Sequence, residues 1–275
     1  MKDATLSVLV TYDQSGARSM LNLINNDRSI NGSNEDAQLP YTYDYNLEKA
    51  AILRAAELVV KDDINNHTRP NGESYKTALQ EYGYNISPRG YLYGEILLFS
   101  DSGNIQTADA AFRSIIGSSG NQSLIRGYYS NVAISHVRIS GNDVWVLLFS
   151  DAPNKGAETT EAVDGAKYAA VNVPLDGVQL TPEYVSGAET VAVGSTVDAP
   201  VYKVNANFSG GLVGNINVST VERNSGDEFL KFDSTDEYVK AENGQVTGLK
   251  AGTGTLSTTF LGKQISVSVG VRPHE

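Results

Sequence analysis

The sequence predicts an α+β protein with two domains, an N-terminal α-β-α sandwich and a C-terminal all-β sandwich. Three observations support this fold class. The chain has 275 residues, which exceeds the usual size of a single domain. Its first half alternates helical and strand-like segments, whereas helical periodicity is absent from about Val171 onward. Residues 153–170 are polar and rich in small residues, as linkers are. We therefore expect domains at 1–152 and 171–275.

Two segments near the N-terminus have the periodicity of amphipathic helices. Residues 15–32 place Met20 and Ile24 on one face, with a glycine following as a stop. Residues 45–63 form the strongest pattern, and Asn46 is the expected N-cap of that helix. Both segments have one apolar stripe, so each is expected to pack against a sheet.

Shorter helices are predicted at 72–84 and 106–117, the latter with Thr107 as N-cap and Gly117 as stop. Strand-like runs lie between and after the helices. They are "GYLYGEILLFS", "NVAISHVRIS" and "DVWVLLFS". The last two runs are joined by Gly141-Asn142-Asp143, which predicts a hairpin. Together these elements predict helices on both faces of a short antiparallel sheet.

The second half reads as short strands separated by Gly, Asn, Asp and Pro, a spacing typical of a β-sandwich. The alternation in "KQISVSVGV" predicts that Ile265, Val267, Val269 and Val271 lie on the buried face of their strand. This half is therefore expected to form its own core.

Composition excludes several classes of function. The formal net charge of -11 disfavours nucleic acid and anionic membranes as partners, because both are polyanions. The absence of cysteine excludes disulfides, thiolate nucleophiles and cysteine-based zinc sites. No run of apolar residues is long enough to predict a transmembrane helix. The N-terminal "MKDATLSVLVTYD" is not a signal peptide, so export would require that a signal has been removed.

The C-terminal stretch "GQVTGLKAGTGTLSTTFLGKQISVSVGV" resembles the end of a bacterial Ig-like domain of group 2. Residues 246–252, "VTGLKAG", match the turn that precedes the last two strands of that family. The glycines at 248 and 252 allow the chain to reverse between short strands. The resemblance implies a module of bacterial surface proteins, which acts there as a spacer or in adhesion.

The N-terminal half resembles a CAP domain over residues 16–150. This superfamily includes cysteine-rich secretory proteins, antigen 5 and plant pathogenesis-related proteins, and it has a cysteine-free bacterial branch. The resemblance depends on the order of "RAAE", "HTRPNG" and "GE". "MLNLINNDR", "FRSIIGSSGN" and "VWVLLF" match further family positions.

The CAP resemblance implies a cleft with two histidines and two acidic residues, which in some members binds zinc or another divalent ion. The first histidine corresponds to His67 and one acid to Glu95, although Ile96 replaces the asparagine that follows it in the family. The second histidine falls on Asn121, and the other acid has no equivalent. Because two protein ligands are too few for a zinc site, we expect no metal, no cofactor and no catalytic residue.

His67 has two interpretations. A histidine in a turn after a helix often caps carbonyl groups or bonds to a neighbouring acid. The CAP resemblance instead places it in a cleft, where it and Glu95 either bind a ligand or simply hydrogen-bond to each other. His136 is expected on the solvent or cleft side of its strand. We found no Gly-x-Ser-x-Gly elbow, P-loop, dinucleotide fingerprint or His-Glu-x-x-His motif.

These observations predict an exported bacterial binding protein, secreted or on the cell surface. Its CAP cleft would contact an extracellular ligand through His67, Glu95 and Asn121, and the Ig-like module would display it. The ligand would be a lipid, a glycan or a protein. One alternative is a weak hydrolase of peptides or esters that uses His67 and Glu95 as acid and base. Another is a passive structural or adhesion component.

Overall fold

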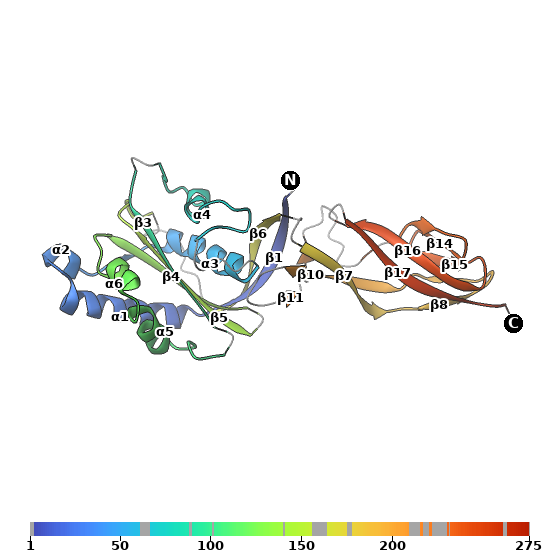
Figure 1. The fold of residues 1–275 in the computed structure, drawn as a ribbon, viewed down its shortest axis with the longest axis horizontal. Helices are drawn as coiled ribbons and strands as arrows, with labels where there is room; N and C mark the ends of the chain where they lie inside the picture. Colours follow the sequence, from blue (N-terminus) through green and yellow to red (C-terminus); the bar gives the residue numbers. More distant parts are fainter. Residues whose placement is uncertain are drawn as a thin grey trace. The chain divides into compact units, whose positions relative to one another are not determined.

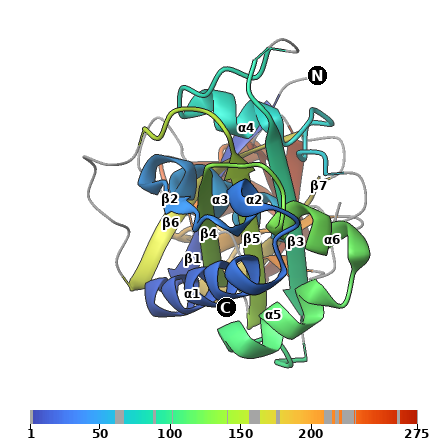
Figure 2. The same ribbon diagram turned by 90° about the vertical axis from the view of Figure 1, so that its left-hand side faces the viewer.

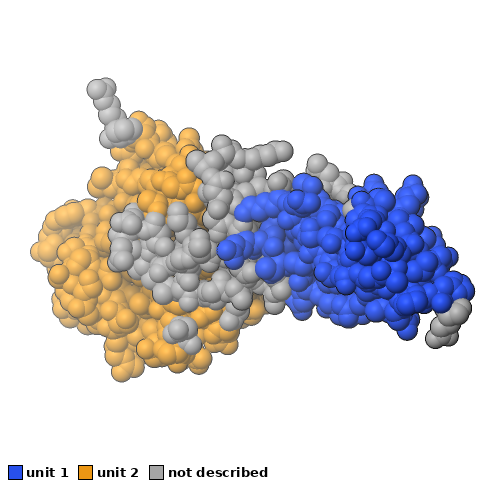
Figure 3. Space-filling view, turned by 45° about the vertical axis from the view of Figure 1, so that its right-hand side comes forward, with its two compact units in different colours: residues 1–7, 174–209, 214–275 blue, residues 8–173, 210–213 orange. Residues whose placement is uncertain are grey.

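The computed structural model describes residues 3–60, 67–87, 90–100, 102–139, 141–155, 164–174, 178–208, 215–216, 220–221, 230, 232–260 and 263–274. The chain divides into two compact units (Figure 3). Unit 1 comprises residues 1–7, 174–209 and 214–275, and unit 2 comprises residues 8–173 and 210–213. Helices and antiparallel sheets occur together, so the predicted mixed α+β composition is confirmed.

The largest sheet has its strands in the order β1 (Asp3–Tyr12), β4 (Asn131–Ile139), β5 (Asn142–Ser150) and β3 (Tyr93–Ser100), with antiparallel neighbours. All of them lie in unit 2 except residues 3–7 of β1, which belong to unit 1. The short β2 (Thr42–Tyr43) runs parallel to β4. The predicted hairpin between β4 and β5 is present, and Gly141 in its turn has a φ of 85°.

Helices lie on both faces of this sheet (Figures 1 and 2). On one face are α1 (Gln14–Asn31) and α5 (Ala108–Ile116), and on the other is α3 (Tyr45–Val60). The remaining helices are short: α2 (Glu35–Gln38), α4 (Lys76–Glu81) and α6 (Ser119–Ile125). Alternation along the strands decides which side chain meets which helix.

The core between the sheet and α1 and α5 uses one set of alternating strand positions. Ile134, Trp145 and Leu147 are completely buried there, against Met20 and Ile24 of α1. The intervening positions, Glu95 among them, point to the face covered by α3. The position of Glu95 next to that helix therefore follows from the pleat of β3.

Two predicted boundaries differ from the structure. Residues 165–170, the end of the predicted linker, form part of β6 (Gly165–Pro174), which pairs with β1. Residues 156–163 of that linker lie outside the described residues. The helix α3 begins at Tyr45, so Asn46 lies inside it and is not its N-cap. The carboxylate of Asp44 accepts the backbone N–H groups of Asn46 and Leu47. Asp44 serves as the cap because it stands directly before the first turn.

The described elements of unit 1 are strands, from two residues in β11 to ten in β17. One sheet contains β7 (Val178–Ser186), β10 (Val201–Phe208) and β11 (Asn215–Ile216). A second contains β9 (Thr196–Asp198), β13 (Ser234–Thr235), β14 (Val239–Glu242) and β15 (Gln245–Gly248). A third contains β8 (Thr190–Ala192), β16 (Gly252–Phe260) and β17 (Lys263–Arg272). The pair β12 (Thr220–Val221) and β1 is antiparallel.

The predicted alternation along β17 is confirmed, since Ile265, Val267, Val269 and Val271 are all buried in the core of unit 1. The turn between β14 and β15 consists of Asn243 and Gly244, with φ of 53° and 78°. A tight hairpin turn of this kind requires two successive residues with positive φ. Only Asn, Asp and Gly adopt positive φ easily. Residues 212–214 and 217–219, in the half predicted to form short strands, lie outside the described residues.

Candidate functional site

His67 lies in a tight turn between α3 and α4. Its φ is 55°, in the left-handed region that a non-glycine residue rarely adopts. Its backbone carbonyl accepts a hydrogen bond from Tyr75, and the neighbouring Thr68 forms a bridge to Ser74. The ring lies edge-on to that of Tyr75, with centroids 6.1 Å apart. Its side chain is 37% exposed, so the imidazole is accessible from solvent.

Glu95 is the partner of His67. The His67 Nδ1 and Glu95 Oε2 atoms are 2.8 Å apart. The glutamate side chain is 0% exposed and lies against α3, where Arg54 donates from Nε to Oε1 at 2.8 Å and from Nη2 to Oε2 at 3.4 Å. Both carboxylate oxygens of Glu95 therefore already accept hydrogen bonds within the protein.

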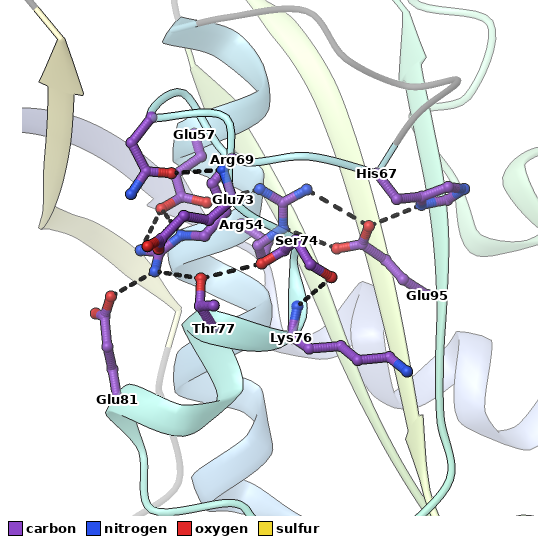
Figure 4. Close-up of polar contacts among 11 residues, drawn as sticks. Arg54, Glu57, His67, Arg69, Glu73, Ser74, Lys76, Thr77, Glu81 and Glu95 are labelled. Carbon is purple, nitrogen blue, oxygen red and sulfur yellow. Dashed lines mark hydrogen bonds and ion pairs between the residues drawn. The ribbon is translucent and has the colours of Figure 1, made fainter. Parts of the chain in front are cut away.

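The ion pair continues as a chain of alternating charges (Figure 4). Arg54 also donates to Glu57 at 2.6 Å, one turn further along α3. Glu57 in turn accepts two hydrogen bonds from Arg69, at 2.9 and 2.6 Å. Arg69 finally reaches Glu81 at the end of α4, at 2.6 Å. This series of ion pairs connects His67 with α4 through side chains that are mostly buried.

Electrostatics keep both arginines charged. Burial by itself lowers the pKa of Arg54, but Glu95 and Glu57 outweigh it, so the pKa of this guanidinium is raised. At Arg69 burial also lowers the pKa, but Glu57 and Glu81 again outweigh it, so this pKa is raised as well. Burial, with the nearby Glu95 charge, raises the pKa of the Tyr75 hydroxyl. That phenol stays protonated and donates to the Tyr93 carbonyl at 3.0 Å.

Asn121, the third residue predicted for the site, lies in α6 and is partly exposed. Among the hydrogen bonds of the described residues, none joins it to His67 or Glu95. The structure thus brings together two of the three predicted residues. Sequence reasoning missed Arg54 and Glu57, although two charges inside the apolar run "AAILRAAELVV" were a signal of buried partners.

A divalent metal does not fit this arrangement. Within the described ranges, no group of three or more His, Asp or Glu side chains is placed to hold an ion. The guanidinium of Arg54 already occupies both oxygens of Glu95 and repels a second cation there. The sequence-based prediction of no metal depended on the small number of ligands, and it stays a prediction.

A separate buried cluster surrounds His136 on the opposite face of the sheet. Its side chain is buried, and its ring stacks on Trp145 with centroids 3.8 Å apart. Asp13 lies 2.8 Å from Nδ1 and Asp143 lies 3.2 Å from Nε2. The expectation of a solvent or cleft position was therefore wrong, because His136 belongs to the strand face that packs under α1. Asp13 also caps α1, accepting from Gly16.

The fold and the site define a mixed α+β protein with a buried ion-pair chain that ends at a partly exposed histidine. No family model matches the sequence, and no curated protein does. Among solved structures, the chain is similar to an outer surface protein from Borrelia burgdorferi. The two share 17% identity over 51% of this chain and 95% of that chain, with a TM-score of 0.40. A likeness of this size assigns neither a fold family nor an activity. No helix within the described residues has the length and apolar character needed to cross a membrane.

Proposed function

We propose that this chain is a binding protein and not an enzyme. The observation that supports the proposal most directly is the environment of Glu95. A general base needs a free lone pair within reach of the substrate proton. The carboxylate of Glu95 is 0% exposed and accepts hydrogen bonds from Arg54 and His67. It can hold the imidazole in place, but it cannot approach a substrate without leaving its arginine.

The proposal includes a domain assignment, with a CAP domain in unit 2 and a bacterial Ig-like group 2 domain in unit 1. The contact between His67 and Glu95 is what the CAP resemblance implies for these motifs. In unit 1, the "VTGLKAG" segment, residues 246–252, leads from β15 into β16, as in the Ig-like family pattern. Bacterial proteins with such modules act outside the cytoplasm, so we infer export or surface display.

Localisation can be tested in the source bacterium. Intact cells are treated with a protease that does not enter them, and the chain is followed with an antibody. We expect the protein in the medium, or on the cells and sensitive to the protease. Protein that stays protected in intact cells and becomes sensitive only after lysis would contradict export.

Ligand binding can be tested by thermal unfolding, because a ligand that binds only the native state raises the melting temperature. The probes are glycan, phospholipid-vesicle and peptide panels, with His67→Ala as the comparison. We expect one class to raise the melting temperature, and the shift to shrink in His67→Ala. If no class shifts the melting temperature, the chain is the passive structural component.

One observation favours the hydrolase as a second candidate. The 2.8 Å contact between His67 and Glu95 is the geometry of an orienting acid and a base. A panel of peptide and ester substrates separates the two functions. Turnover that is lost in both His67→Ala and Glu95→Gln would establish the enzyme. Our proposal predicts no turnover that depends on either residue.

A further inference from the structure

Unit 2 contains a pocket that is separate from His67 and Glu95. Its volume is about 430 Å³, and its described lining comes from α3, from the end of α4 and from β6. This size falls within the range of roughly 300–1,000 Å³ that small-molecule sites occupy. Its polar and aromatic lining includes Tyr45, Lys49, Glu81, Tyr82, Lys167 and Tyr168.

The acidic groups of the pocket already have arginine partners. Glu48, which also lines it, is buried and pairs with Arg18 at 3.2 Å. The Glu48 carboxylate accepts a further hydrogen bond from the Tyr43 hydroxyl. Glu81 pairs with Arg69 at 2.6 Å, while its own side chain stays 46% exposed. Each of these two carboxylates therefore has an arginine partner, and Glu81 shares Arg69 with Glu57.

The basic groups are not neutralised. Within the described part of the chain, neither Lys49 nor Lys167 has a carboxylate partner. The Lys49 Nζ lies 3.5 Å from the Asn46 amide oxygen, and the Lys167 Nζ lies 5.1 Å from the centroid of the Tyr12 ring. Both lysines line the pocket, so they give its wall two positive charges in a chain whose net charge is -11. An anionic group is the natural counterion for them.

The tyrosines supply flat faces and hydroxyl groups beside these charges. Tyr168 lines the pocket and is 59% exposed, so it is accessible to a ligand. Burial and the nearby Glu81 charge raise the pKa of Tyr82, which keeps its hydroxyl protonated and able to donate. Tyrosine rings pack on the apolar face of a ligand ring, and tyrosine hydroxyl groups form hydrogen bonds with its polar edge.

We propose that this pocket binds an acidic saccharide, a sugar ring that bears a carboxylate. The carboxylate pairs with Lys49 and Lys167, the ring packs on Tyr168, and Glu81 accepts hydrogen bonds from ring hydroxyls. A neutral sugar leaves the two ammonium groups without a counterion. A small anion without a ring gains nothing from the tyrosines. The site lies apart from His67 and Glu95, so it goes beyond the binding function proposed above.

The test uses the full chain and NMR titration with D-glucuronate, D-glucose and acetate. We expect glucuronate to bind at least about tenfold more tightly than glucose, the effect of one charge-assisted contact. Lys167→Met should weaken glucuronate binding by about tenfold, and Tyr168→Ala should weaken both sugars. Lys76→Met, which removes a lysine of α4 outside the pocket lining, is the matched control and should bind as the wild type does.

Several results would overturn this assignment. One is that glucuronate causes no change in the NMR spectrum, and another is that glucose or acetate binds as tightly as glucuronate. A third is that Lys76→Met weakens glucuronate binding as much as Lys167→Met does. Trp145 fluorescence shows whether each variant is folded, since this buried residue is the only tryptophan of the chain. His67→Ala should still bind glucuronate, which separates a failure of this pocket from a failure of the function proposed for His67.

Discussion

At the scale of single residues, Glu95 and Arg54 form an ion pair whose side chains are 0% and 1% exposed. Two charges in such a place are stable only together, because each would otherwise be desolvated without compensation. His67 contributes differently, since its side chain is 37% exposed and water can replace its hydrogen bond. His67 and Glu95 therefore differ in what their removal costs.

Glu95→Gln should lower the free energy of unfolding of unit 2 by about 3 kcal/mol, because it leaves the buried Arg54 with one carboxylate instead of two. His67→Gln should lower it by less than about 1 kcal/mol, because water can replace the hydrogen bond of this partly exposed side chain. Urea unfolding followed by Trp145 fluorescence measures both variants. Equal losses in the two would contradict the role given to burial.

Asp27 gives a pH dependence with a defined sign. Arg126 donates to both of its oxygens, at 2.8 and 2.9 Å, and these bonds hold the pKa of Asp27 below the ordinary 3.8. A carboxyl whose pKa is lowered in the folded state stabilises the protein at pH values above its ordinary pKa. This stabilisation is lost as the pH falls below that value. Asp27→Asn should therefore cost about 1 kcal/mol near neutral pH.

That cost should shrink as unfolding is measured at successively lower pH, through and below 3.8. Glu73→Gln is the control, since Glu73 is exposed, lies outside the helices and has no arginine contact among the described ion pairs of the chain. A cost that stays constant across this range would show that the Asp27 carboxylate does not act through its charge.

The sequence identified His67 and Glu95 because both lie in short motifs, and a motif is a local property. It did not identify Arg54 as their partner. That contact depends on the face of α3 that meets β3, and no local pattern contains this information. Asn121 had the opposite outcome, since alignment with a motif placed it in the site while no described hydrogen bond joins it there.

At the scale of elements, α5 shows a start that local chemistry predicts well. Thr107 was the expected N-cap, and its hydroxyl accepts the backbone N–H of Ala110 at 3.3 Å. The cap of α3 was missed by two residues, because Asp44 and Asn46 are both good capping residues. The extent of β6 was missed because its pairing partner, β1, lies more than a hundred residues away.

Thr107→Ala should lower the free energy of unfolding of unit 2 by about 1 kcal/mol, since it leaves a first-turn N–H without its acceptor. Thr107→Ser keeps the hydroxyl and should retain most of the stability. Trp145 is a suitable reporter here as well, because its indole N–H donates to the carbonyl of Ile105, just before the helix, at 2.8 Å. If serine and alanine have the same effect, the hydroxyl does not cap α5.

At the scale of the whole molecule, each unit has a hydrophobic core of its own. The core that includes Trp145 lies within unit 2, and the core that includes Val246 and Val269 lies within unit 1. Separate cores allow separate cooperative transitions, so a substitution in one core should leave the stability of the other unchanged. Trp145 reports on one of them, while calorimetry detects both.

Gly248 offers the sharpest test of this independence. A Cβ atom at this position would lie 2.5 Å from the carbonyl oxygen of Ala192, and backbone atoms cannot move aside as a flexible side chain can. Gly248→Ala should therefore cost unit 1 about 2 kcal/mol through overpacking. The calorimetric transition of unit 1 should move to lower temperature, while the Trp145 transition stays unchanged.

The matched control is Gly120→Ala in α6, where a Cβ meets nothing closer than 3.8 Å and alanine is the better helix former. It should move only the Trp145 transition, and upward. If either substitution shifted both transitions equally, the two cores would unfold as one.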